Sequence, residues 1–324
     1  MSDSSAIEWT DATWNPTTGC HKISPGCKNC YAKREWTRLS ANPKSVYFKR
    51  AFEDVAYHTE RLDQPIRWKN PRRIFVNSMS DLFDDDVPDQ FIADVFAHMA
   101  YARQHTFQLL TKRSARMRAL LTSEAFAEQY EDAIALASDV AEGILGRRRD
   151  FDQNARLTTD IRAFDPVLPL ANVWLGVSVE NDEYAGERIP PLLQTPAAVR
   201  WISAEPLLGQ VNCGMYLSRT NMPGLRLMPG FRDPLPGIDW VVAGGESGPK
   251  ARPSHPGWFR SLRDQCLAAG VPFFFKQWGE WVSVSEVEGK GDHHHFDDGA
   301  TVRRVGKQIA GRQLDGREWN EYPQ

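Results

Sequence analysis

The sequence predicts an α/β protein built on a parallel (β/α) barrel that is partial or nearly complete. Two observations predict it: short apolar runs recur along the chain, and most are followed by a helical pattern. Strands that are apolar on both faces are typical of parallel sheets covered by helices on each side. With a short first strand before Cys20, the pattern gives about seven βα units. A doubly wound open sheet is the alternative fold.

The apolar runs are bounded by polar residues, as buried strands usually are. They are Ile74–Ser78, Phe107–Lys112, Val173–Ser178, Arg200–Glu205, Trp240–Glu246 and Pro272–Gln277. Between them, Pro88–Gln104 has the periodicity of an amphipathic helix, and the residues near 123–170 are predicted to form a helical insertion. Met215–Pro236 holds several prolines and is predicted to be a long loop.

We expect one barrel domain over residues 1–278 and a C-terminal β-hairpin tail over residues 279–324. The tail contains His293–His295, which we expect at the solvated tip of the hairpin because three adjacent histidines do not easily face one metal ion. Trp278, Trp281 and Trp319 are expected to pack this tail against the barrel.

Composition limits the class of protein. The chain has 324 residues with a net charge of −3, which does not by itself indicate a nucleic-acid binder. Its first residues lack the apolar run of a signal peptide, and its apolar runs are too short to span a membrane. We therefore expect a cytoplasmic protein that does not associate with membranes, in which the five cysteines are not a disulfide framework.

Three of these cysteines, Cys20, Cys27 and Cys30, have the spacing C-x6-C-x2-C. Glycine and proline interrupt regular structure between them, which favours a loop that can wrap a metal. A helix is expected to begin after Cys30, and a helix N-terminus among lysines should lower the pKa of the thiols. Three thiolates on a [4Fe-4S] cluster leave one iron for another ligand. The alternatives are a structural zinc site, completed by His21 or a distant histidine, and buried thiols without a metal.

Several motifs besides the cysteine loop point to a known family. They are Trp14–Ala32, Asn77–Phe83, Leu110–Arg113, Gly176–Asn181, Ser203–Leu207, Gly244–Gly248 and Gly311–Trp319. In these stretches the chain resembles the phage Gp37/Gp68 family, also called DUF5131, over most of its length except the insertion near 123–170. That family is similar to the radical SAM superfamily, in which a three-cysteine loop follows the first strand of a partial barrel.

This resemblance implies a barrel of the radical SAM type and S-adenosyl-L-methionine (SAM) as a second cofactor. The usual spacing in that superfamily is C-x3-C-x2-C, so this chain has three more residues in the first gap. It also has Asn29 where an aromatic residue often precedes the last cysteine. Gly244-Gly245-Glu246 follows a late strand, so we expect a tight turn there rather than the glycine-rich element that grips the SAM amine.

Polar residues follow each predicted strand and would share one rim of the barrel. A cofactor with an amino-acid group, a ribose and an adenine needs carboxylates, amides, hydroxyls and a cation, and these residues supply them. The predicted cofactor-binding residues are Ser78, Ser80, Asp81, Lys112, Ser178, Glu180, Asn181, Glu205, Glu246 and Lys276, with Thr111 and Gln277 beside them.

The leading functional hypothesis is an iron–sulfur enzyme of the radical SAM type, with Cys20, Cys27 and Cys30 as ligands of a [4Fe-4S] cluster. It would cleave SAM reductively and act on a substrate that the sequence does not name, for which DNA or RNA is the working guess. It would need an electron donor, and a partner protein is conceivable. The alternatives are a non-catalytic [4Fe-4S] protein that binds nucleic acid or a partner, and a structural zinc protein.

Overall fold

The computed structural model describes residues 5–149, 167–217 and 237–324. Its largest element is a seven-stranded sheet with the order β1-β4-β5-β6-β7-β8-β9. These strands are β1 (Ala12–Trp14), β4 (Arg73–Val76), β5 (Thr106–Thr111), β6 (Val173–Ser178), β7 (Val199–Ala204), β8 (Trp240–Gly244) and β9 (Phe273–Gln277). The pairs β1–β4, β4–β5, β7–β8 and β8–β9 are parallel.

Strands of this sheet follow one another in chain order, without the reversal that defines a doubly wound fold. The α/β class and the parallel sheet predicted from the sequence are therefore confirmed, and the doubly wound alternative is wrong. The strands are buried almost throughout, as the near-continuous apolar runs predicted. The observed strand ends differ from the predicted ones by at most two residues.

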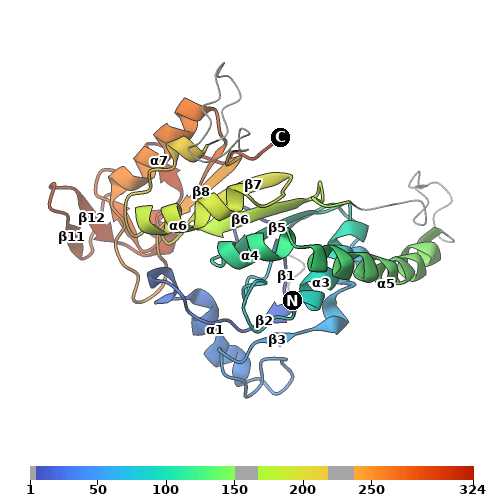
Figure 1. The fold of residues 1–324 in the computed structure, drawn as a ribbon. Coiled ribbons are helices and arrows are strands. Elements are labelled where there is room, and N and C mark those ends of the chain that lie inside the picture. The colour runs from blue at the N-terminus through green and yellow to red at the C-terminus, as the bar shows by residue number, and fades with distance from the viewer. Residues whose placement is uncertain (1–4, 150–166, 218–236) are drawn as a thin grey trace. The chain divides into compact units, whose positions relative to one another are not determined.

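Helices connect most successive strands. They are α1 (Tyr31–Ser40), α2 (Gln64–Arg67), α3 (Asp89–Tyr101), α4 (Ser114–Leu121), α5 (Glu124–Arg149), α6 (Asp182–Leu193), α7 (Pro256–Ala269) and α8 (Lys307–Ala310), with the short 3-10 turns η1 (Pro25–Cys27), η2 (Thr59–Arg61) and η4 (Gly214–Tyr216). The helix α3 confirms the predicted helix, but it is buried on nearly all sides, so its predicted amphipathic character is wrong. The predicted insertion begins as α5, which lies along α3 (Figure 1), and its residues 150–166 fall outside the described part of the chain. Most of the predicted loop Met215–Pro236 also falls outside it.

The chain divides into two compact units that interleave along the sequence. Unit 1 contains Met1–His21, Arg50–Leu175 and Thr195–Ala198, and unit 2 contains Lys22–Lys49, Gly176–Gln194 and Val199–Gln324. Unit 1 has its own aromatic core, in which Phe96 meets Phe126 edge to face. In unit 2, Trp201 packs on Trp240.

Beyond β9 the tail in unit 2 forms more than a hairpin. The strands β10 (Trp281–Ser283), β12 (Thr301–Arg304) and β11 (His293–His295) make an antiparallel three-stranded sheet, and β13 (Gln313–Leu314) pairs with β14 (Arg317–Glu318). The three histidines form the edge strand β11, so their expected place at a hairpin tip is wrong; pairing with β12 makes them extended. Trp278 packs on Phe259 and Phe275, as predicted for the tail tryptophans.

In unit 1 a second small sheet pairs β2 (Thr17–Thr18) with β3 (Ala56–Tyr57). Among the helices that the structure describes, none has both the length and the apolar character needed to cross a bilayer.

Candidate functional site

Cys20 lies in unit 1, just after β2, in a backbone that is tightly fixed. Gly19 has φ of +93°, and a Cβ there would lie 2.6 Å from the carbonyl oxygen of Asp54. Only glycine fits this combination of positive φ and close approach without strain. The Cys20 amide donates to the Phe52 carbonyl at 3.0 Å. The chain is thereby held on both sides of the first cysteine.

A buried arginine adjoins the Cys20 sulfur. Arg113 follows β5, and its Nη1 lies 3.9 Å from Cys20 Sγ and 3.1 Å from Asp81 Oδ2. Its Nη2 lies 2.6 Å from Asp84 Oδ2 and donates to the His21 carbonyl at 3.2 Å. The side chains of Arg113, Asp81 and Asp84 are at most 8% exposed. Two carboxylates therefore fix the two arms of the guanidinium beside the sulfur.

Asp81 was predicted to bind a cofactor, but in the structure both of its carboxylate oxygens accept hydrogen bonds from the protein. Its Oδ1 accepts from Thr111 Oγ1 at 2.7 Å and from the Phe83 amide at 3.1 Å, and its Oδ2 accepts from the Lys112 amide at 3.1 Å. Asp81 thus ties the segment after β4 to the end of β5 and orients Arg113.

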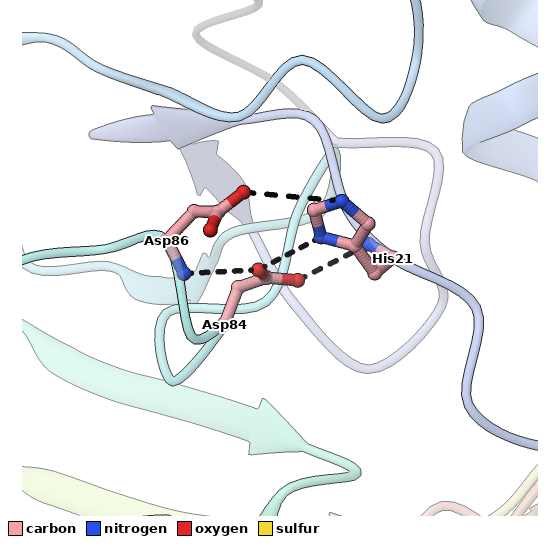
Figure 2. A group of neighbouring side chains, drawn as sticks. All are labelled: His21, Asp84 and Asp86. Carbon is pink, nitrogen blue, oxygen red and sulfur yellow. Dashed lines mark hydrogen bonds and ion pairs between the residues drawn. The ribbon is translucent and has the colours of Figure 1, made fainter.

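His21, Asp84 and Asp86 form a three-residue group in the described part of the chain that could hold a metal ion, since their ligand atoms lie within 4.8 Å of one another (Figure 2). The His21 ring Nδ1 and backbone amide both lie 3.1 Å from Asp84, and the Asp86 amide donates to the same carboxylate. Burial alone would raise the pKa of Asp84, but the hydrogen bonds from His21 and the charge of Arg113 leave it lowered. Since these protein donors and Arg113 already neutralise Asp84, the group is better suited to holding the Cys20 segment than to binding a cation.

Cys27 and Cys30 lie in unit 2, where η1 ends at Cys27 and Cys30 is the N-cap residue of α1. The helix predicted to begin after Cys30 is therefore confirmed. Ser24 Oγ lies 3.7 Å from Cys27 Sγ and donates to Glu180 Oε1 at 2.6 Å. Gly26 is pressed against the same carboxylate: a Cβ at this glycine would overlap Glu180 Oε1 and lie 2.7 Å from its Cγ.

Glu180, at the end of β6, is held from its other side. Arg188 Nη1 donates to Glu180 Oε2 at 2.9 Å and to the Ser178 carbonyl at 2.8 Å. Both side chains of this ion pair are 1% exposed. Glu180 was predicted to bind a cofactor, and in the structure it joins the loop before Cys27 to α6.

Glu246, after β8, makes the equivalent connection next to Cys30. Asn29 Nδ2 donates to Glu246 Oε2 at 2.9 Å and to the Lys250 carbonyl at 2.8 Å. The Arg252 amide and Nε donate to the same carboxylate at 2.8 and 2.9 Å. Burial alone would raise the pKa of Glu246, but the hydrogen bonds from Arg252 and Asn29 leave it below its usual value. Glu246 is therefore ionised at neutral pH and holds the residue before Cys30.

Glu205 and Lys276 form a third predicted pair in unit 2. Lys276 Nζ lies 2.9 Å from both carboxylate oxygens of Glu205, and Gln277 Nε2 donates to Glu205 Oε1 at 3.1 Å. The side chains of Glu205 and Lys276 remain 19% and 14% exposed. A Cβ at Gly244 would lie 3.2 Å from the Glu205 carboxyl carbon. This carboxylate and cation are the predicted pair that stays partly open to solvent.

The remaining predicted residues make local contacts. In unit 1, Ser78 Oγ donates to Asn15 Oδ1, and Ser80 Oγ bonds to Thr17. In unit 2, Asn181 Oδ1 accepts from the Tyr184 amide and caps α6. Gly245 donates its amide to the Gln277 carbonyl, so the pairing of β8 with β9 continues past Gly244. The tight turn expected at Gly244-Gly245-Glu246 is therefore wrong, and the turn comes later, where the Ala251 amide donates to the Gly248 carbonyl.

Cys20 does not have the lowered pKa that we expected from nearby lysines. Its thiol is largely buried, and this burial raises its pKa, as does the nearby Asp81, while Arg113 opposes the rise. The expected lowering of the pKa does not occur at Cys20 because its sulfur is buried and lies near the carboxylate of Asp81. Cys213 and Cys266 are fully buried, as the sequence indicated for Cys266, and burial raises the pKa of Cys213 to about 12.

Sequence reasoning missed the partners that hold the cysteine loop. They are Arg113 in unit 1 and Ser24, Asn29, Arg188 and Arg252 in unit 2. Arg113 immediately follows a predicted strand, so its place at the strand end could have been read from the sequence. The other pairings depend on which segments the fold brings together.

A model of a family described as a protein of unknown function (DUF5131) matches residues 4–323. No curated protein and no solved structure matches the chain. The family that the sequence motifs suggested is therefore confirmed across nearly the whole chain. The chain belongs to the DUF5131 family.

Proposed function

We propose that this protein is an iron–sulfur enzyme of the radical SAM type, in which Cys20, Cys27 and Cys30 bind three irons of a [4Fe-4S] cluster. The observation that carries the proposal is the C-x6-C-x2-C loop, whose three cysteine residues are partly exposed, whereas Cys213 and Cys266 are fully buried. A ligand thiol must be reachable by the metal, and a structural thiol need not be. Thiolates are also the ligand type that iron–sulfur clusters require.

The loop also fits a cofactor-binding role because its backbone is anchored around each cysteine. In unit 1, Gly19 and Arg113 fix the surroundings of Cys20; in unit 2, Ser24 and Asn29 tie the residues next to Cys27 and Cys30 to buried carboxylates. Anchoring of this kind orients ligands for a metal.

SAM is the proposed second cofactor, and the reduced cluster would supply the electron that cleaves it. Of the predicted contacts, Glu205 and Lys276 suit it best, since a carboxylate and an ammonium match the amine and carboxylate of an amino-acid group. Both side chains stay partly exposed, whereas Glu180 and Glu246 are held by arginines. The role of Glu205 and Lys276 would be to bind and orient.

A nucleic acid is the proposed substrate class. Lys22, Lys28 and Arg34 are exposed on the cysteine loop and on α1, where they could meet phosphates. Binding of single-stranded DNA or RNA should then weaken steeply with salt. Binding that is unchanged between low and high salt would count against this substrate.

The enzymatic proposal is tested with anaerobically reconstituted protein, dithionite and SAM, by chromatography of the products. The expected result is 5′-deoxyadenosine in the complete mixture and none from a Cys27→Ala variant. An intact cluster that never yields 5′-deoxyadenosine would overturn the enzymatic part and favour a non-catalytic cluster protein. A colourless protein with one bound zinc would overturn the cluster itself.

A further inference from the structure

We infer that Arg113 is a positioning residue for Cys20, which holds the sulfur by an N–H···S contact and sets the reduction potential of the cluster bound there. This inference rests on the proposed function, because it assigns a role to Arg113 only if Cys20 is a cluster ligand. Nothing in the sequence motifs assigned Arg113 a role.

The geometry around Arg113 allows little freedom. Its two terminal nitrogens lie near Cys20 Sγ, Asp81 Oδ2, Asp84 Oδ2 and the His21 carbonyl. Asp84 also accepts the His21 amide, so one carboxylate holds both the arginine and the residue after Cys20. Moving Arg113 away from the sulfur would remove the arginine that forms an ion pair with two buried carboxylates.

The charges explain why a cation is needed at this sulfur. A thiolate at Cys20 would stand near the buried carboxylates of Asp81 and Asp84, and Arg113 is the cation that lies between them and the sulfur. Positive charge and hydrogen bonds at the cysteine sulfurs favour the reduced, more negative state of a cluster. Removing Arg113 should therefore make the cluster harder to reduce.

Arg116, on α4, provides a matched control for Arg113, which is the N-cap residue of that helix. Arg116 bonds to the carbonyls of Phe83, Asp84 and Val87 and to Asp89 at 2.8 Å, so it holds the backbone of the same segment without contact to a sulfur. Arg116→Met removes a guanidinium with a comparable set of hydrogen bonds. Its effect measures what the loss of an arginine from α4 does without loss of a sulfur contact.

The test compares wild type, Arg113→Met, Arg113→Lys and Arg116→Met after anaerobic reconstitution. Two quantities are measured: iron and sulfide per chain, and the midpoint potential from a redox titration followed by electron paramagnetic resonance. In Arg113→Met we expect a more negative potential and iron affinity about 10- to 100-fold lower, the usual cost of losing a partner of a metal ligand. Arg113→Lys should leave the midpoint potential near the wild-type value, because lysine keeps the positive charge. It should still lower the iron affinity, because lysine cannot donate to both carboxylates as the guanidinium does. Arg116→Met should match wild type in both.

Equal potential and iron content in wild type and Arg113→Met would overturn the inference while leaving the cluster proposal intact. A wild-type protein that binds no iron and sulfide would instead overturn the proposed function. If Arg113→Met does not fold, Arg113→Gln serves in its place: it keeps polar hydrogen bonds, removes the positive charge, and should make the potential more negative. An unchanged potential in Arg113→Gln would then overturn the inference.

Discussion

The two stretches that carry the cysteines are held in different ways. The Cys20 segment (residues 17–21, unit 1) has its sulfur next to a guanidinium, and its backbone is fixed by Gly19. The Cys27–Cys30 segment (residues 24–30, unit 2) is held through neighbours, with Ser24 on Glu180 and Asn29 on Glu246. In the proposed cluster, the first segment would therefore tune the electronic properties and the second would mainly set the position of the ligands.

Both segments nevertheless use one device, a strand-end carboxylate paired with an arginine. Asp81 pairs with Arg113, Glu180 with Arg188, and Glu246 with Arg252. A carboxylate held in this way has a fixed position, so it can accept hydrogen bonds from a loop at a defined place. Substitutions in the two segments should therefore separate their roles.

The largest effect is expected from Glu180→Ala, which removes the carboxylate that holds the Cys27–Cys30 segment. It leaves Arg188 buried without its anionic partner and removes the acceptor of Ser24. Breaking a buried pair of this kind costs about 3–5 kcal/mol, measured as the free energy of unfolding in urea. Glu187→Ala, at an exposed position of α6 next to Arg188, should change stability by less than about 0.5 kcal/mol. Equal effects of the two substitutions would contradict the structure.

The Cys20 segment should be the more sensitive to acid. His58 Nε2 lies 2.8 Å from Thr18 Oγ1, and burial lowers the pKa of His58 to about 4, helped by Arg61. Between pH 6.5 and 4 the unfolded chain binds a proton that the folded chain does not, so stability falls as the pH falls. The loss should be about 2 kcal/mol after allowance for solvent screening.

Urea unfolding at several pH values measures this loss. His58→Asn should flatten the pH dependence of stability over that range, because asparagine does not bind a proton in either the folded or the unfolded chain. A slope that persists in His58→Asn would place the acid sensitivity elsewhere in the protein.

Gly26→Ala tests how tightly the Cys27–Cys30 segment packs. The new methyl group overlaps the Glu180 carboxylate, which Ser24 and Arg188 hold in place. Overpacking of this kind costs about 1–3 kcal/mol and should also lower the iron content. Gly186→Ala is the matched control: it points into open space on α6 and should stabilise the helix by about 0.5–1 kcal/mol. Gly26→Ala with wild-type stability and iron content would show that the segment is loose.

Asn29→Ala should have the smallest effect on stability, about 1 kcal/mol, because Arg252 still pairs with Glu246. Its effect on iron should be larger than its effect on folding, since Asn29 adjoins Cys30. The measurement is iron per chain against the urea midpoint. A loss of stability without a loss of iron would argue that Asn29 supports α1 and not the ligand loop.

The fold could be predicted further than the site. Strands such as Val173–Ser178 were located to the residue because a strand buried on both faces is an uninterrupted apolar run between polar ends. The carboxylates at the strand ends were also found. Their role could not be predicted, because an acidic residue that binds a cofactor and one that pairs with Arg188 or Arg252 look the same in a sequence. Only the folded chain shows that Glu180 and Glu246 hold the cysteine loop.

The central claim is that Cys20, Cys27 and Cys30 together hold an iron–sulfur cluster. It is tested most directly by iron and acid-labile sulfide analysis of anaerobically reconstituted wild type, the triple variant with alanine at these positions, and Cys213→Ala. The account predicts about four iron and four sulfide per chain in wild type and Cys213→Ala, and near-complete loss in the triple variant. Iron and sulfide retained by the triple variant, or absent from wild type, would contradict it.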